Sequence, residues 1–340
     1  MTTTKDKALG ALLGLAVSDA LGTTLEFSRP APAPWLPLLK GPHTEIIGGG
    51  PFGVGPGQTT DDTMMSCCLA SSLKAKDGFD FDDVAERYIN WRQVTFDCGS
   101  QTGQSLSAYR DNPECPGKVV WDRSGRNMAG NGSLMRTAPI GVFFSGDPEA
   151  IVEVSILDSS ITHFDPRCML ACAALNSAIG YAVATDMADI SELGAVVDEA
   201  LRAGVKYLHN NWNDMGAEIS FAFADLMEDL EMASRSDPEM YGPQVNIYSM
   251  QGFVRVAFRL AFWTLLHSDS FEAGLTHCVN QGGDSDTNGA ITGSLLGAVY
   301  GESGIPDRWK NTVLGFDKEN SPFGKNGLYH PLRLLEMVGY

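Results

Sequence analysis

The amino-acid sequence predicts an all-α fold, a single compact orthogonal bundle of many helices. Apolar residues recur at helical spacing along most of the 340 residues, while the alternating pattern of a half-buried strand is nearly absent. Two aspartate clusters of similar composition lie at residues 60–63 and 284–287, almost the length of the chain apart. If the two clusters form one site, no independent N-terminal domain can hold all of it. Residues 1–340 are therefore expected to form one domain whose ends fold toward each other.

The helical periodicity divides the chain into a series of helices separated by loops of recognisable composition. The helices are expected at residues 4–21, 60–75, 80–92, 100–110, 131–138, 148–161, 166–184, 191–209, 213–231, 248–266, 270–279, 285–300 and 326–338. The segments rich in proline, glycine or polar residues are expected to be loops, at 29–42, 48–58, 111–130 and 233–247. Asp165-Pro166 marks one helix start.

The first helix and the last long helix each carry small residues at every fourth position. These positions are Gly10, Gly14, Ser18 and Gly22 near the start, and Gly289, Gly293, Gly297 and Gly301 near the end. Each glycine inside a helix costs about 1 kcal/mol relative to alanine, so a row of them must serve some structural purpose. A row of small residues lets another backbone approach closely. We expect these two helices at the centre of the bundle, where they can pack on each other.

Each aspartate cluster combines two carboxylates with hydroxyl side chains at the expected start of a helix, behind a glycine-rich segment at 53–58 or 281–283. Taken alone, a carboxylate pair at a helix start can simply complement the helix dipole. Four carboxylates brought together, however, repel strongly unless divalent cations neutralise them. Oxygen-only ligands suit Mg²⁺, Mn²⁺ or Ca²⁺ rather than zinc. The two clusters together therefore predict a central binuclear metal site.

The composition restricts the partners and the compartment. The chain carries 24 Lys and Arg against 42 Asp and Glu, a net charge of −18, which argues against nucleic acid or an anionic membrane as partner. The seven cysteines are odd in number and lie partly within apolar helical pattern, which is typical of reduced thiols in a cytoplasmic protein. His163, Cys168 and Cys172 have a faint zinc-like spacing, but a fourth ligand is lacking and core packing is favoured.

The N-terminal segment could pass for a secretory signal peptide. Lys5 and Lys7 precede an apolar run at residues 8–17, and small residues follow at 18–20. The thiol content favours a cytoplasmic location instead. The apolar runs also fall short of the ~20 residues that a membrane span needs, so no membrane association is expected.

Six motifs follow one another along the chain, and their order carries more information than any one of them. They are Gly14-Leu15-Ala16-Val17-Ser18-Asp19-Ala20-Leu21-Gly22 with Glu26 shortly after, Thr60-Asp61-Asp62-Thr63, Phe96-Asp97-Cys98-Gly99, Gly130-Asn131-Gly132-Ser133-Leu134-Met135-Arg136, Thr162-His163 and Gly283-Asp284-Ser285-Asp286-Thr287. This ordered set resembles the ADP-ribosylglycohydrolase family from residue 8 to about residue 300, with little contribution from 185–250. The family's fold is all-α, and the resemblance implies two Mg²⁺ or Mn²⁺ ions as cofactors.

The resemblance also implies a role for each matching position. The metal ligands would be Thr60, Asp61, Asp62, Asp284, Asp286 and Thr287. The catalytic carboxylates would be Glu26, Asp62, Asp97 and Asp284, with an acid–base role for Glu26 and a place beside the scissile ribose for Asp97. The ADP-ribose would be held by Gly130, Asn131, Gly132 and Ser133 through backbone N–H groups, and by His163 near its ADP part. A helix N-terminus with free amides is a suitable diphosphate site.

Simpler structural roles remain open at several of these positions. Glu26 also suits a solvated loop after the first helix, and Asp97 also suits a cap of the helix that starts near Ser100. A structural hydrogen bond competes with ligand contact for His163. Arg136 is suited either to the ligand diphosphate or to one of the 42 acidic residues.

One helical face near the expected adenine end combines arginine with aromatic side chains. Its members are Arg255, Phe258, Arg259, Phe262 and Trp263. Core packing is the favoured interpretation of the aromatics, because large apolar side chains at helical spacing usually face a protein interior.

The implied reaction cleaves the bond at the anomeric carbon of the distal ribose and releases ADP-ribose and an unmodified side chain. Two metals can orient the ribose diol and activate a bridging water, and a carboxylate can move the proton. The expected substrate is an ADP-ribosylated protein, with ADP-ribosylarginine favoured over ADP-ribosylserine. The protein is expected to act as a monomer.

Three other functions stay open at this point. The first is an immunity protein against an ADP-ribosylating toxin; toxin-blocking members carry an N-terminal extension, and because the glycine helix starts by residue 8 here, hydrolysis is favoured over occlusion. The second is a crystallin-like or ADP-ribose-binding member without activity, against which the intact ligand set argues. The third is an unrelated two-metal phosphohydrolase, which the sparse basic residues around the motifs disfavour.

Overall fold

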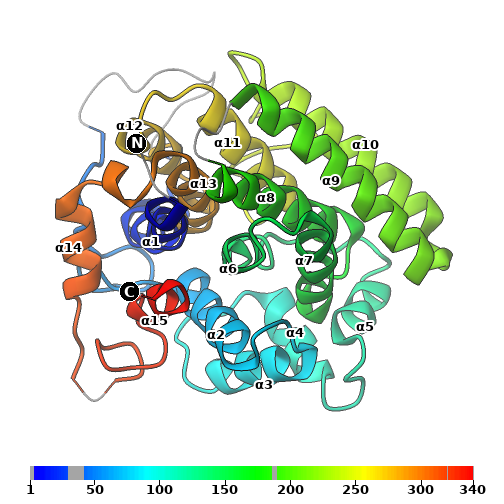
Figure 1. The fold of residues 1–340 in the computed structure, drawn as a ribbon, viewed down its shortest axis with the longest axis horizontal. Helices are drawn as coiled ribbons and strands as arrows, with labels where there is room; N and C mark the ends of the chain where they lie inside the picture. The colour runs from blue at the N-terminus through cyan, green and yellow to red at the C-terminus, as the bar shows by residue number, and fades with distance from the viewer. Residues whose placement is uncertain (1–3, 30–41, 186–189, 320, 340) are drawn as a thin grey trace.

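The described part of the chain consists of residues 4–29, 42–185, 190–319 and 321–339 of the computed structural model (Figure 1). It contains fifteen α-helices, four short 3₁₀ helices and no strand, and three isolated bridges are its only β contacts. The predicted all-α fold is confirmed. The predicted Pro-rich loop at 29–42 lies almost wholly outside the described residues.

The helices follow one another in a long series. They are α1 (Thr4–Gly22), η1 (Thr23–Leu25), α2 (Asp61–Lys76), α3 (Phe81–Arg92), α4 (Ser100–Ala108), α5 (Pro116–Arg123), α6 (Ala138–Phe143), α7 (Pro148–Thr162), α8 (Pro166–Ala184), α9 (Ile190–Asn211), η2 (Asn213–Met215), α10 (Gly216–Ala233), α11 (Val254–Leu266), α12 (Phe271–Val279), α13 (Ser285–Tyr300), η3 (Glu302–Gly304), α14 (Asp307–Gly315), α15 (Leu332–Leu335) and η4 (Glu336–Val338). They cross in several directions: α1 points along the view in Figure 1, whereas α9 and α10 lie across it.

The predicted helix at 131–138 was wrong. Residues 131–136 form consecutive turns, and α6 begins only at Ala138. Pro139 lies in the first turn of α6, where the missing N–H of proline costs nothing, so the helix begins where the prediction ended it. The signal was present in the sequence, because proline suits a helix start far better than a continuation.

Four other boundaries or elements differ from the prediction. The predicted helix at 248–266 begins only at Val254, after a series of turns. Of the predicted helix at 326–338, only the short α15 and η4 are helical. Two helices were missed, and each starts at a proline: α5 at Pro116, within the predicted loop 111–130, and α14 directly after Pro306.

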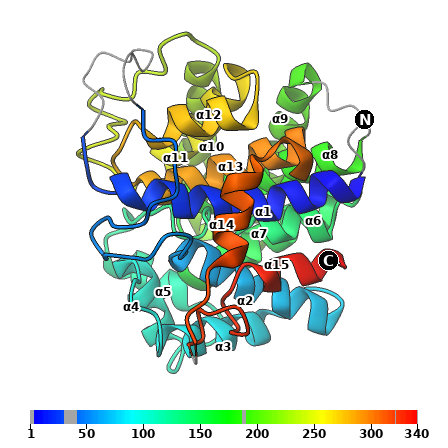
Figure 2. The same cartoon turned by 90° about the vertical axis from the view of Figure 1, so that its left-hand side faces the viewer.

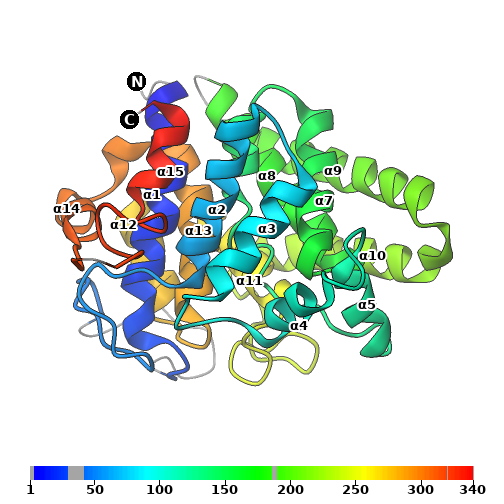
Figure 3. The ribbon, with the colours of Figure 1, turned by 90° about the horizontal axis from the view of Figure 1, so that it is seen from below.

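The helices α1 and α13 pack backbone against backbone inside the fold, between α14 and α8 (Figures 1 and 3). A Cβ atom on Gly14 would lie 2.3 Å from the carbonyl oxygen of Gly293, and one on Gly297 would lie 2.0 Å from that of Gly10. Real Cβ atoms do not approach so closely, so only glycine fits. The prediction that the two glycine rows pack on each other is confirmed. We call this contact the glycine seam.

The two ends of the described chain lie side by side. The Lys5 Nζ donates a hydrogen bond to the carbonyl oxygen of Gly339 at 3.2 Å, and the chain ends are close in Figure 3. From the same C-terminal part, α14 crosses the outer side of α1 (Figure 2). The expected approach of the chain ends is confirmed, and it brings the two aspartate clusters to one region.

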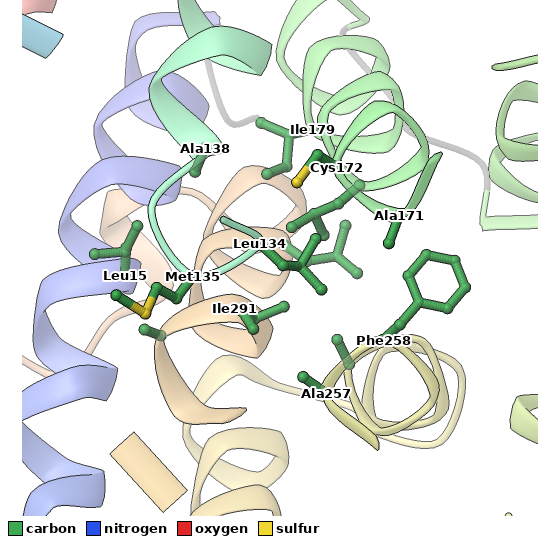
Figure 4. Packing of buried hydrophobic residues seen from close by; sticks show 14 of the residues in the cluster. Leu15, Leu134, Met135, Ala138, Ala171, Cys172, Ile179, Ala257, Phe258 and Ile291 are labelled. Carbon is green, nitrogen blue, oxygen red and sulfur yellow. The ribbon is translucent and has the colours of Figure 1, made fainter. Parts of the chain in front are cut away.

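The apolar core surrounds the glycine seam and extends toward α8 and α11 (Figure 4). Leu15 of α1 and Ile291 of α13 line it on the seam side, and Phe258 of α11 faces it from the other side. Cys168 and Cys172 of α8 are buried in this core with free thiols, so core packing explains their spacing. All seven cysteines are free, as predicted.

The arginine–aromatic face of α11 is also part of the interior. Its aromatics Phe258, Phe262 and Trp263 are buried, which confirms the core interpretation. Both of its arginines pair with Asp229 of α10, where Arg255 Nε and Arg259 Nη2 lie 2.7 and 2.6 Å from the carboxylate. Arg255 also pairs with Asp225 and Glu228 of the same helix, at 2.9 and 2.6 Å.

Two helices, α1 and α8, are long and apolar enough to cross a membrane by length and composition. In each, 83% of the most apolar window is buried within the fold. The core position of both helices accounts for their apolar character.

Candidate active site

All six sequence motifs meet at one polar pocket of about 290 Å³. Its lining includes, from the predicted site, Glu26, Asp61, Asp97, Gly130, Asn131, Gly132, His163, Asp284, Asp286 and Thr287. The other predicted residues, Thr60, Asp62 and Ser133, are buried directly behind this lining. We call this cavity the central pocket.

Glu26 reaches the central pocket because its loop is tied to the C-terminal aspartate motif. The Phe27 N–H donates to the carbonyl oxygen of Gly283 at 2.6 Å, and the Gly283 N–H donates to that of Ser28 at 3.0 Å. Gly283 has a φ of +67°, and a Cβ there would lie 2.4 Å from the Ile247 carbonyl oxygen. Glycine is therefore required at this position, and the exchange of hydrogen bonds places Glu26 beside Asp286.

The first aspartate motif is positioned by a carboxylate from another helix. Asp19 of α1 is fully buried and accepts hydrogen bonds from the backbone N–H groups of Thr60 (3.0 Å) and Thr63 (3.2 Å). It also accepts from both threonine hydroxyls, at 3.0 and 2.5 Å. Thr60 makes no side-chain cap of α2, so Asp19 supplies the N-cap acceptor that the helix start needs. These hydrogen bonds fix the start of α2, and with it the positions of Asp61 and Asp62.

Burial and mutual repulsion raise the pKa values of the carboxylates in the central pocket. Burial, and then the charges of Asp284, Asp97 and Asp19, raise the pKa of Glu26 to about 8. Burial raises the pKa of Asp97 to about 6. Burial and neighbouring carboxylates also hold the pKa values of three aspartates well above their usual range, at Asp61, Asp62 and Asp286. So much negative charge in one place requires cations or protons.

The pocket carboxylates include a group that is able to hold a divalent cation. Glu26, Asp97 and Asp286 each offer one oxygen, and these oxygens lie within 4.8 Å of one another. Two buried oxygens, Glu26 Oε2 and Asp62 Oδ1, have no hydrogen-bond donor among the described residues. Buried carboxylate oxygens without a hydrogen-bond donor suit a hard divalent cation, the class that includes Mg²⁺, Mn²⁺ and Ca²⁺.

Thr60 differs from the other predicted ligands. Its hydroxyl is buried between two carboxylates, 3.0 Å from Asp19 Oδ1 and 2.9 Å from Asp62 Oδ2. By contrast, Thr287 lines the central pocket. The roles of both threonines as metal ligands stay predictions.

The loop at Gly130–Ser133 forms the opposite wall of the central pocket. Two of its amides are already used, because the Gly130 N–H donates to Gln101 Oε1 and the Asn131 N–H donates to the Gly252 carbonyl oxygen, each at 3.0 Å. The amides of Gly132 and Ser133 have no acceptor among the described residues. An anion at this wall would therefore be bound by the latter two, at a turn rather than at the predicted helix N-terminus.

Two side chains of the same loop make hydrogen bonds within the protein. The Asn131 Nδ2 donates to Asp284 Oδ2 at 2.7 Å, which links the loop to the carboxylate end of the pocket. The Ser133 hydroxyl turns into the core, where Ser159 Oγ donates to it at 2.9 Å. The Ser133 side chain therefore has no path to a ligand in the central pocket.

His163 lies at the loop end of the pocket as a neutral ring. Burial and the charge of Arg136 hold the pKa of His163 well below its usual value. Arg136 Nη1 donates to Thr162 Oγ1 at 2.8 Å, and that hydroxyl lies 2.8 Å from His163 Nδ1. With the hydroxyl proton directed to Nδ1, His163 Nε2 carries the ring proton. The Nε2 atom lies close to the backbone of Gly132, because a Cβ atom added to Gly132 would be 3.0 Å from it.

Arg136 is a structural residue and not a ligand for the diphosphate. It is fully buried, and its guanidinium donates to Asp158 Oδ2 at 3.2 Å and to the Asp158 carbonyl oxygen at 3.0 Å. It also donates to the carbonyl oxygen of Gly132 at 3.3 Å. Of the two interpretations left open by the sequence, pairing with an acidic residue is correct, and the pair supports the loop from behind.

A model of the ADP-ribosylglycohydrolase family matches residues 1–325 of this sequence. The chain belongs to the ADP-ribosylglycohydrolase family. Membership of this family makes the protein a hydrolase of the glycosidic linkages of ADP-ribose, and similar proteins are named for such activities. The site geometry therefore belongs to a family whose members cleave such bonds.

Three proteins similar to this ADP-ribosylglycohydrolase are informative. The ADP-ribosyl-[dinitrogen reductase] glycohydrolase of Rhodospirillum rubrum is 31% identical over 309 residues, covering 89% of each chain. The ADP-ribosylarginine hydrolase Tri1 of Pseudomonas putida (strain GB-1) is 30% identical over 317 residues, covering 91% of this chain and 74% of that protein. A solved structure described as an ADP-ribosylglycohydrolase-related protein complex matches with a TM-score of 0.72 at 29% identity, covering 99% of this chain and 100% of the other.

Sequence reasoning missed three polar residues of this ADP-ribosylglycohydrolase site. The sequence motif predicts no separate role for Asp19, although a carboxylate inside an apolar helix face indicates a buried partner. Gln101 and Thr102 of α4 line the central pocket, and Gln101 holds the Gly130 loop. Nothing in the sequence of α4 separates these two from an ordinary polar helix face.

Proposed function

We propose that this ADP-ribosylglycohydrolase is a metal-dependent hydrolase that removes ADP-ribose from modified arginine side chains of proteins. The observation that carries the proposal is the meeting of both aspartate motifs and Glu26 at one pocket whose opposite wall offers free amides. The choice of arginine is supported by the relative named ADP-ribosylarginine hydrolase Tri1. ADP-ribosylserine is the alternative linkage that the test must include.

The proposed binding mode divides the central pocket between its two walls. The diphosphate and proximal ribose would bind at the Gly132 and Ser133 amides, and the neutral His163 ring would lie against the ADP part. The wall that faces the loop carries the carboxylates Glu26, Asp61, Asp97, Asp284 and Asp286, and we call it the carboxylate wall. The distal ribose would lie there, with its anomeric carbon facing Glu26 and Asp97. Asn131 would hold the two walls in register through its bond to Asp284.

The metal pair would be held by the aspartates Asp61, Asp62, Asp284 and Asp286 with Thr287. When bound, such a pair supplies a hydroxide at neutral pH and orients the ribose diol. Glu26 has an unpaired buried oxygen and a raised pKa, so it is suited to accept a proton from water and to return it to the leaving nitrogen. The transition state is oxocarbenium-like, so the surrounding carboxylates also stabilise developing positive charge.

The decisive experiment measures ADP-ribose release from matched arginine-linked and serine-linked ADP-ribosyl peptides with Mg²⁺, Mn²⁺ or EDTA. We expect metal-dependent release from the arginine-linked peptide and loss of release in Asp61→Ala and Asp286→Ala. Lys206→Ala on the far helix α9 serves as the control and is expected to retain full activity. Release from the serine-linked peptide alone would move the proposal to the other linkage, and tight ADP-ribose binding without release from either would contradict hydrolysis.

A further inference from the structure

A second polar cleft of about 540 Å³ lies on one face of α4, between the ends of α3 and α5. Figure 3 shows these three helices next to one another. Arg92 ends α3 and Arg123 ends α5, and both line the cleft. The floor is the small-residue face of α4, and Asp111 is the one carboxylate among the described lining residues. We call this feature the arginine cleft.

The two arginines of this cleft are unusual in such an acidic protein. All fourteen arginines are in the described residues, and ten of them have a carboxylate of those same residues within ion-pair distance. The remaining four are Arg29, Arg92, Arg110 and Arg123. Two of these four line one cleft, although the chain has 42 acidic side chains to pair with. Their charges are left available for an anion from outside the chain.

Arg92 has an exposed side chain whose guanidinium lies along α4. A Cβ on Gly103 would lie 3.1 Å from Arg92 Nη2 and 3.3 Å from Nε, so the guanidinium lies against the bare backbone of α4. Its charge also faces the Cys98 thiol. A planar guanidinium in this position is suited to a carboxylate, which it can bind through two parallel hydrogen bonds.

The arginine cleft and the central pocket meet at the start of α4. Gly99 and Ser100 line both. Asp97, two positions before Gly99, lines the central pocket, and Cys98 between them lines the cleft. The other residues of α4 separate the two: Gln101 and Thr102 face the central pocket, whereas the opposite face of the helix forms the floor of the cleft. The cleft therefore adjoins the central pocket at the segment that follows Asp97, and α4 lies between the rest of the cleft and the Gly130–Ser133 loop.

We propose that the arginine cleft binds an acidic segment of the ADP-ribosylated protein, next to the modified side chain in the chain or in space. This inference rests on the proposed function, because it assumes that the leaving side chain projects from the carboxylate end of the central pocket. The segment carries Asp or Glu side chains that pair with Arg92 and Arg123. The phosphates of ADP-ribose are not the occupant, since the amides assigned to them lie across α4.

The test compares three substrates: ADP-ribosylarginine without a peptide, an ADP-ribosylarginine peptide with glutamates beside the modified residue, and the same peptide with glutamines. The enzymes are the wild type, Arg92→Gln, Arg123→Gln and the double variant. Arg110→Gln is the matched control, because Arg110 is also exposed and lacks a carboxylate partner among the described residues but does not line the cleft.

We expect the wild type to prefer the glutamate peptide through a lower KM. Each cleft variant should raise that KM by about two- to fivefold and the double variant by about tenfold, as for exposed ion pairs. Release from the glutamine peptide and from ADP-ribosylarginine should not change, and the preference should fade between about 0.01 and 1 M salt. Equal KM values for the two peptides, or an equal loss on ADP-ribosylarginine, would overturn the proposal.

Failure of the proposed function gives a different result. If the wild type releases nothing from ADP-ribosylarginine itself, the reaction is wrong, and the cleft is then tested by fluorescence anisotropy with the same labelled peptides. Tighter binding of the glutamate peptide that is lost in the double variant but kept in Arg110→Gln supports the arginine cleft. Equal binding of both peptides overturns it.

Discussion

The glycine seam and the carboxylate wall both depend on the contact between α1 and α13, but they have opposite effects on the stability of the fold. Along the seam, α1 and α13 approach so closely that no side chain separates their backbones. At the start of α13, the same approach forces Asp284 and Asp286 against Glu26 and the first aspartate motif. The seam lowers the energy of the fold, whereas the carboxylate wall raises it. Close packing at one end of a contact thus maintains an unfavourable arrangement of charge at the other.

The largest expected effect is at the seam itself. Gly297→Val would place carbon atoms within 2.0 Å of the Gly10 carbonyl oxygen, so the helices must separate and the variant is expected not to fold. Soluble yield and far-UV circular dichroism measure this outcome. Gly194→Ala in α9 is the control, because nothing lies within 4 Å of its added Cβ and alanine favours a helix. A folded, active Gly297→Val protein would contradict the central role of the seam.

A change at the carboxylate wall should separate stability from activity. Asp62→Asn removes a buried negative charge that lacks a donor at Oδ1, so the metal-free protein should melt roughly 2 °C higher. The same variant should lose more than about a hundredfold in metal-dependent turnover, because it removes a proposed ligand. Thermal denaturation in EDTA and an ADP-ribose release assay measure the two effects. A variant that is both less stable and fully active would reverse the contrast between the two regions.

Asp19 connects the two regions, and its loss should weaken metal binding without removing a ligand. An asparagine can accept fewer of the four hydrogen bonds from Thr60 and Thr63, so the start of α2 should shift. We expect Asp19→Asn to bind Mg²⁺ about 10- to 100-fold more weakly by calorimetry. Thr63→Ser retains the hydroxyl and should bind normally. Equal affinities for all three proteins would show that Asp19 only supports the core.

The smallest effect is a pH dependence confined to the metal-free protein. Carboxyl groups with raised pKa values bind more protons in the folded state than in the unfolded state, so their contribution to stability is lost as pH rises. The loss should extend from the unfolded pKa near 4 to about 8, the pKa of Glu26. The melting temperature in EDTA should therefore fall between about pH 5 and pH 8. Saturating Mg²⁺ should flatten this dependence, and a rise over the same range in EDTA would contradict it.

The seam and the wall also differ in how far the sequence predicts them. Rows of glycine at every fourth position predict a backbone contact, because little besides close helix packing offsets the cost of glycine in a helix. The two aspartate motifs likewise predict that they meet. Each has two carboxylates and hydroxyl side chains at a helix start, and this shared composition is expected of two halves of one site. Asp19 was missed because its partners are backbone N–H groups of another helix, and such partners leave no residue pattern. The inward turn of the Ser133 hydroxyl was missed because its partner, the Ser159 hydroxyl, lies 26 positions further along the chain, in α7.

The helix boundaries that failed depended on tertiary contacts or on proline. The turns at 131–136 are held by Arg136, whose bond to the Gly132 carbonyl oxygen competes with a regular helix at that point. The start of α6 and the starts of the two missed helices are marked by prolines. A prediction from hydrophobic periodicity alone does not take proline into account. The sequence thus predicts which segments meet, while the detailed shape of the pocket wall depends on contacts between distant residues.

The glycine seam also determines when during synthesis the protein can fold. The Ser285 hydroxyl bonds to the Gly22 carbonyl oxygen across 263 positions of sequence. At about 5 to 20 residues per second, the ribosome needs on the order of 10 to 50 s to make that intervening chain. During this interval the apolar α1 has emerged without its partner and must be kept from aggregating. We therefore expect nascent chains that stop before α13 to depend on chaperones, and full-length chains to become protease-resistant only after α13 leaves the ribosome.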